Sequence, residues 1–158
     1  MESALSRGEI TESALFDADY QPVPGSNPRQ VTTGFVTLTD RLLPPIQEPL
    51  LGFDQRVVFC AAVDRNGYLP THNNAWSQPQ RPDDPAWNAA HSRNRRIFND
   101  RAGLAAARNA RPHLLQSYER DMGGGQRVPM KEADVPIRVR GRHWGALRLA
   151  FRPGESQG

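Results

Sequence analysis

Hydrophobic residues follow two different spacings along this chain, one typical of helices and one typical of strands. In residues 29–43 the apolar positions recur at steps of three and four: Val31, Phe35, Leu38, Leu42 and Leu43. This spacing predicts a helix with one apolar face, which we expect to dock on a sheet. A further helical turn is expected from Pro45 to residue 51, ending at Gly52, and a short helix after Thr11, whose hydroxyl would cap it.

The apolar run at residues 57–63 is too short for a confident helix and predicts a buried strand. Asn66 and Gly67 follow it, and this pair favours the positive φ angles of a hairpin turn. We therefore expect a second strand at residues 68–72, pairing back on the first. Pro70 would place that strand at a sheet edge or at an irregularity.

The middle of the chain has weaker periodicity. Residues 73–94 are polar and interrupted by prolines, yet they contain Trp76 and Trp87, which a plain linker would not need. We expect a folded loop that covers a pocket or the core. Residues 95–109 predict one or two short helices, separated near Gly103.

The last third predicts three antiparallel strands, at residues 114–120, 127–140 (the adjoining segments 127–134 and 135–140) and 143–151, because glycine-containing turns separate segments of alternating polarity. Together with the first hairpin, the chain is expected to form an α+β fold with a cupped five-stranded antiparallel sheet and helices on one face. Three parts are expected: an N-terminal helical section (1–53), the sheet core (54–152) and a disordered tail (153–158). Helices closing the cupped face would leave room for a modest ligand.

Composition excludes several classes of protein. The formal charge is only +3, and basic residues are scattered among acidic ones, so nucleic-acid binding is not expected. No apolar stretch approaches the roughly 20 residues that span a bilayer, and no export signal is found, so no direct membrane insertion is expected. The single cysteine, Cys60, lies in the apolar run and fits a reducing cytoplasm.

Four segments carry a resemblance to a known family: residues 42–49 (LLPPIQEP), 63–73 (VDRNGYLPTHN), 95–101 (RRIFNDR) and 140–148 (RGRHWGALR). They resemble the PAS/Cache-like sensory module of proteobacterial methyl-accepting chemotaxis proteins, over about residues 10–152. The resemblance implies a cytoplasmic, dimeric, non-enzymatic sensor that reports a small molecule to the signalling region of a chemoreceptor. Residues 1–53 would then include the remnant of a signalling helix, and the module would be C-terminal in its parent.

Candidate ligand-binding residues lie around the predicted cavity. Arg95, Arg96 and Arg101 flank an apolar helical segment, where an inward guanidinium would pair with Asp100 or with an anionic ligand such as an organic acid. A solvated helix face is the alternative. Further candidates for the aromatic wall and its polar anchors are Tyr68, His72, Asn74 and Trp76, with edge-strand packing as their alternative. Trp144 would cap either the pocket or an interface.

Other chemistry finds little support in the sequence. The four histidines form no cluster with metal-site spacing, so no metal site is expected. Haem held by one or two of these histidines stays an alternative, although the sequence has no motif for covalent haem attachment. No nucleophile motif is present, and residues 123–125 read as a flexible turn rather than a phosphate loop. No cofactor is therefore expected. A dimerisation module without ligand is the remaining alternative.

Overall fold

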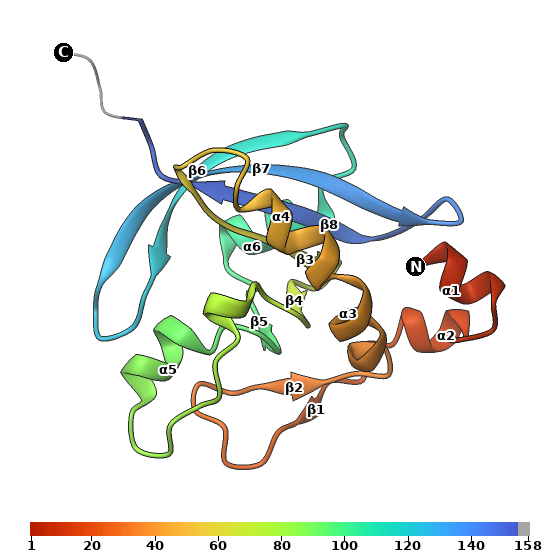
Figure 1. The fold of residues 1–158 in the computed structure, drawn as a ribbon, viewed down its shortest axis with the longest axis horizontal. Helices are drawn as coiled ribbons and strands as arrows, with labels where there is room; N and C mark the ends of the chain where they lie inside the picture. The colour runs from red at the N-terminus through yellow and green to blue at the C-terminus, as the bar shows by residue number, and fades with distance from the viewer. Residues whose placement is uncertain (155–158) are drawn as a thin grey trace.

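The computed structural model describes residues 1–154, and these form an α+β fold (Figure 1). Its helices are α1 (Glu2–Ser6), α2 (Glu12–Leu15), α3 (Val36–Leu42), α4 (Pro44–Leu50), α5 (Pro85–His91) and α6 (Arg101–Arg108), with one 3-10 turn, η1 (Asn74–Trp76). Its strands are β1 (Gln21–Pro22), β2 (Val31–Thr32), β3 (Val57–Asp64), β4 (Tyr68–Leu69), β5 (Arg96–Ile97), β6 (Leu114–Asp121), β7 (Arg127–Val139) and β8 (Arg142–Phe151).

The main sheet is antiparallel and has the strand order β3-β8-β7-β6. The central strand β8 pairs with both β3 and β7, and β7 forms a long hairpin with β6. The expected α+β class is confirmed, as are the buried strand after residue 56 and the strands of the last third, where residues 127–139 form one continuous strand. The main sheet has four strands, however, where five were expected.

The missing fifth strand has a physical explanation at the free edge of β3. The Ala62 N–H donates to Oε1 of Gln47 and the Cys60 N–H donates to Oδ1 of Asn73, both at 2.8 Å. Gln47 and Asn73 are fully buried. Because these side chains satisfy the edge amides, β4 is free to pair with β5 in a separate two-stranded ribbon.

Helices contact both faces of the sheet, not one face as expected. Consecutive residues of β3 alternate between two core clusters, with Ala62 in one and Ala61 and Val63 in the other. The first cluster joins the sheet to α1, α2 and α3, and the second joins it to α6 through Ala107. The N-terminal section and the sheet therefore share one interior. Figure 1 shows α1 beside the turn between β7 and β8, where Glu2 Oε1 accepts the Arg140 N–H at 2.6 Å.

Two helix predictions need correction. The helix expected at residues 29–43 begins only at Val36, because Val31 lies in β2 and its N–H donates to the carbonyl of Arg95 at 2.7 Å. The apolar face itself was predicted well, since Val31, Phe35 and Leu38 are all buried. The expected break near Gly103 is also wrong: this residue lies inside α6, where any Cβ would meet the Phe98 carbonyl oxygen. The Thr11 cap of α2 is confirmed, with Ala14 N–H as its donor.

No helix among residues 1–154 combines the length and the apolar character that crossing a bilayer requires. The tail prediction covers residues 153–158, of which 155–158 lie outside the described residues.

Candidate functional site

A cavity of about 310 Å³ lies between the sheet and the β4-β5 ribbon. Its wall is drawn from β3, β4, β5, β6, β7 and β8, so segments from residue 59 to residue 148 meet at it. Its most unusual feature is a concentration of guanidinium groups: Arg93, Arg96, Arg120, Arg127 and Arg148. The volume is at the lower end of the range of small-molecule pockets. The cavity therefore has the size of a small ligand and the charge to bind an anion.

Arg120 has the least satisfied environment of these arginines. Its residue is only 4% exposed, and its Nε and Nη2 atoms are buried with no hydrogen-bond partner in residues 1–154. Burial, opposed by Tyr118 and Glu132 but reinforced by Arg148, lowers the pKa of Arg120 to about 10. The group stays charged at neutral pH, although an unpaired buried charge is costly. An unpaired, buried guanidinium of this kind is typical of a site that binds an anion.

Aromatic rings hold the guanidinium planes in place. The Arg120 guanidinium carbon lies 4.9 Å from the Phe59 ring centroid and 4.6 Å from that of Trp76. Those of Arg93 and Arg96 lie 5.1 and 4.9 Å from the ring centroid of Phe98. These are cation–π distances, and they fix the planes of the guanidinium groups without neutralising their charge. The donor edges are thus oriented before a ligand binds.

Arg93 and Arg96 form the second cationic wall. Arg93 Nη1 donates to the carbonyls of Ala89 (2.7 Å) and Asp121 (2.8 Å), which ties the end of α5 to the end of β6. Arg96 Nη1 donates to the same Ala89 carbonyl at 3.2 Å. Burial and then the charges of Arg120 and Arg96 lower the pKa of Arg93 to about 9. Neither side chain has a carboxylate partner within the described part of the chain.

His72 supplies a neutral polar group to the same cavity. Burial, followed by the nearby arginine charges, lowers its pKa well below the ordinary value, so the ring is neutral at physiological pH. Its Nδ1 accepts the N–H of Asn73 at 2.7 Å, which places the proton on Nε2. The Nε2–H has no protein acceptor among the described residues. His72 is therefore a further donor for a ligand oxygen.

A buried ion pair forms part of the cavity wall. Arg148 donates to Glu132 through Nε (2.6 Å) and Nη2 (3.0 Å), and both residues are almost completely buried. Burial opposes ionisation of Glu132, but the Arg148 guanidinium keeps its pKa below the ordinary value. The buried Asp134 lies two residues further on the same face of β7 and accepts from Gln116 Nε2 at 2.9 Å. Burial and the Glu132 charge raise the pKa of Asp134 to about 9.

Stability is expected to fall as pH rises because of Asp134. Its folded-state pKa is raised, so between about pH 4 and pH 9 the folded protein holds a proton that the unfolded chain has lost. Over that interval the free energy of unfolding decreases by up to about 1.4 kcal/mol per pH unit from this group. Urea unfolding at pH 5, 7 and 9 should show a smaller decrease for Asp134→Asn than for wild type. Asp83→Asn, a change at an exposed carboxylate, is the control and should keep the wild-type slope; an equally steep slope in Asp134→Asn would contradict the assignment.

Three of the predicted site residues line the cavity: His72, Arg96 and Asp100. Asp100 also caps α6, where its Oδ1 accepts the Gly103 N–H at 3.1 Å. Arg101 lies in a neighbouring groove that shares Asp100 and Tyr118 with the cavity.

The other five predicted residues do not line the cavity, and four of them have a structural role instead. Tyr68 is in the core and donates its hydroxyl to the Val31 carbonyl, while Trp144 donates Nε1 to the Leu15 carbonyl and so caps neither the pocket nor an exposed interface. Asn74 is exposed. Trp76 acts only from behind Arg120, with its Nε1 donating to the Val58 carbonyl.

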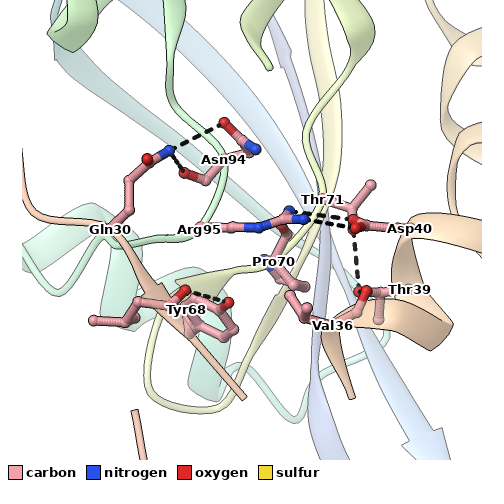
Figure 2. A network of polar contacts seen from close by, with 10 residues as sticks. Gln30, Val36, Thr39, Asp40, Tyr68, Pro70, Thr71, Asn94 and Arg95 are labelled. Carbon is pink, nitrogen blue, oxygen red and sulfur yellow. Dashed lines mark hydrogen bonds and ion pairs between the residues drawn. The ribbon is translucent and has the colours of Figure 1, made fainter. Parts of the chain in front are cut away.

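Arg95 is the clearest correction among them, and Figure 2 shows its surroundings. It turns away from the cavity and pairs with Asp40 of α3, with Nη2 2.7 Å from Oδ2, while Nη1 donates to the Pro70 carbonyl at 3.1 Å. Arg95 lies just before β5 and has a φ of +58°, in the left-handed region, whereas Arg96 begins the extended strand β5 and lines the cavity. The local turn of the backbone at Arg95 therefore directs its side chain away from the cavity.

Sequence reasoning missed Arg93, Arg120 and Arg148, together with Glu132. A signal was present in the strand pattern, because Arg148 shares its face of β8 with Ala146 and Ala150, both completely buried. A charged residue between two small apolar residues of one face indicates a buried polar site rather than a solvated surface.

Among residues 1–154 there is no group of three or more histidine, cysteine, aspartate or glutamate side chains able to hold a metal ion. His72 is the one histidine that lines the cavity, so the haem alternative rests on this residue, and an absorption spectrum after haem addition tests it. In comparisons with known proteins, no family model, curated protein or solved structure matched the chain.

Proposed function

We propose that this chain is a non-enzymatic sensor module that binds a small anion in the arginine-lined cavity. The observation that carries the proposal is the pair of unpartnered Arg120 atoms, Nε and Nη2, buried at a cavity wall. Keeping a buried charge unpaired lowers stability, and such a cost is expected at binding sites rather than in structural cores. An anion on these two donors would recover the lost hydrogen bonds.

A sensor also needs a route from its ligand to another part of the molecule, and the chain next to the cavity supplies one. His72 and Arg96 line the cavity, and their immediate neighbours Thr71 and Arg95 both bind Asp40 of α3. Thr71 Oγ1 donates to Asp40 Oδ1 at 2.6 Å, and the Thr71 carbonyl accepts from Gln47 of α4. Ligand contacts at residues 72 and 96 would therefore bias the packing of α3 and α4.

The receptor context of the proposal comes from the resemblance of four segments to the PAS/Cache-like modules of chemoreceptors. The strand arrangement is compatible with it, since an antiparallel sheet and the β4-β5 ribbon enclose a small cavity. In that context we propose a cytoplasmic homodimer whose N-terminal helices pass ligand occupancy to a signalling region. A module that only dimerises would have no use for unpaired arginines in a cavity.

Anion binding is expected to depend on Arg120. In Arg120→Met, loss of two charge-assisted hydrogen bonds of about 1.5–3 kcal/mol each should weaken binding at least tenfold. The same change should raise the melting temperature of the unliganded protein, because it removes an unpaired buried charge. The measurement is calorimetric titration with succinate, citrate, phosphate and sulfate, alongside thermal melting.

Arg111→Met, a change at an exposed arginine away from the cavity, is the matched control and should bind as wild type does. The proposal is wrong if no anion of the panel binds the wild-type protein, or if Arg120→Met binds as tightly as wild type.

Signal transmission is expected to depend on Asp40. In wild type, a bound anion should change the amide hydrogen exchange of α3, residues 36–42. In Asp40→Asn, which weakens the contact with Arg95, affinity should stay within about threefold, whereas the exchange response of α3 should be largely lost. Exchange measured by mass spectrometry with and without the anion checks this. If the anion changes the hydrogen exchange of α3 in Asp40→Asn as much as in wild type, Asp40 does not transmit the signal from the cavity to α3.

A further inference from the structure

The charge of the cavity wall indicates how many charges its ligand carries. Three guanidinium residues that line the cavity are less than one-tenth exposed: Arg93, Arg120 and Arg148. The one buried ionised carboxylate that faces them is Glu132, which is committed to Arg148. The acidic residues at the rim, Asp100, Glu119 and Asp121, are exposed, where solvent screens their charge. Two buried positive charges therefore lack a counter-ion.

The free atoms of Arg120 indicate which chemical group binds. Nε and Nη2 form one edge of the guanidinium, and this edge takes a carboxylate through two parallel hydrogen bonds. Arg148 shows this arrangement in the same cavity wall, where its own Nε and Nη2 bind the two oxygens of Glu132. The corresponding edge of Arg120 has no partner in residues 1–154.

The two positive charges without a counter-ion, those of Arg120 and Arg93, are held by contacts with different groups. Arg120 is held by the rings of Phe59 and Trp76, whereas Arg93 lies against Phe98 and is tied by Nη1 to two backbone carbonyls. Two anchoring points on separate walls suit two anionic groups joined by a short carbon chain better than one compact anion. The volume of about 310 Å³ limits that chain to a small one.

We infer that the ligand is a small organic dicarboxylate, with one carboxylate bound bidentate to the Nε–Nη2 edge of Arg120 and the other near Arg93 and Arg96. This inference rests on the proposed anion-binding function and narrows it to a ligand class. His72 Nε2–H supplies a further donor between these groups.

Calorimetric titration of the full chain with succinate, acetate and inorganic phosphate tests the inference, using wild type and Arg120→Lys. Lysine keeps the positive charge but lacks the two-donor edge. We expect succinate to bind wild type at least tenfold more tightly than either acetate or phosphate. We also expect Arg120→Lys to weaken succinate binding at least tenfold, while its melting temperature shows that it is folded.

Two results would overturn the dicarboxylate inference while leaving anion binding in place. One is phosphate or acetate binding at least as tightly as succinate, and the other is undiminished succinate affinity in Arg120→Lys. If none of the three anions binds wild type, the inference fails, and the proposed function fails with it when citrate and sulfate do not bind either.

Discussion

Replacing Glu132 by glutamine is expected to lower the free energy of unfolding by about 3–5 kcal/mol. The change removes the negative partner of Arg148, a residue that is 5% exposed and lies near the Arg120 charge. Two positive charges would then share one poorly solvated wall without a fixed counter-ion. Urea unfolding followed by circular dichroism measures the loss.

A double variant distinguishes the destabilisation caused by an unpaired buried charge from the net contribution of the Glu132–Arg148 ion pair to stability. Glu132→Met with Arg148→Met replaces the pair by apolar side chains, and it should recover most of the stability lost in Glu132→Gln. Glu119→Gln, at an exposed position of β6, is the matched control and should change stability by less than about 0.5 kcal/mol. If Glu132→Gln is as stable as this control, the Glu132–Arg148 pair does not stabilise the cavity wall.

The second large effect is expected at Gly145, in β8. A Cβ on this residue would lie 1.9 Å from the Val63 carbonyl oxygen and 2.7 Å from the Asp64 Cα. Both are backbone atoms of β3, so no side-chain rotation can relieve the clash, and β3 and β8 must separate locally. Gly145→Ala should destabilise the protein by at least about 3 kcal/mol or prevent folding.

Gly141→Ala is the informative comparison for Gly145→Ala. Gly141 has a φ of +78° in the turn between β7 and β8, but nothing lies within 4 Å of an added Cβ. Its substitution should cost only about 1–2 kcal/mol, from backbone strain alone. Thermal melting of both variants checks the order, and a larger loss at Gly141 than at Gly145 would contradict the packing described for β8.

The sequence predicted those elements of the fold that can be recognised from the pattern of their own residues. Alternation located β6, β7 and β8, and the apolar run located β3, because a half-buried or buried strand needs only its own sequence to be recognised. The pairing of β4 was not predictable in this way. It depends on Gln47 and Asn73, which occupy the free edge of β3 from elsewhere in the chain.

The site was predicted only in part for the same reason. His72, Arg96 and Asp100 were found from their neighbourhood in the sequence, but Arg120 and Arg148 come from β6 and β8, where alternation shows that a strand has two faces and not whether the polar face meets solvent or a cavity. The face of a strand that points to a cavity is set by the whole sheet. Arg95 was misplaced because a short helix was expected from residue 95, whereas this residue has a φ of +58° and its side chain pairs with Asp40.

The most direct test of the central claim, that the cavity binds an anion through Arg120, observes its Nε–H group by NMR. A ¹H–¹⁵N spectrum of the arginine Nε groups is recorded while succinate is added, with Arg120→Lys used to assign the signal. We predict a saturable shift of the Arg120 signal, with a much smaller change for Arg148, whose Nε already donates to Glu132. An Arg120 signal that stays unmoved at saturating succinate and phosphate would contradict the account.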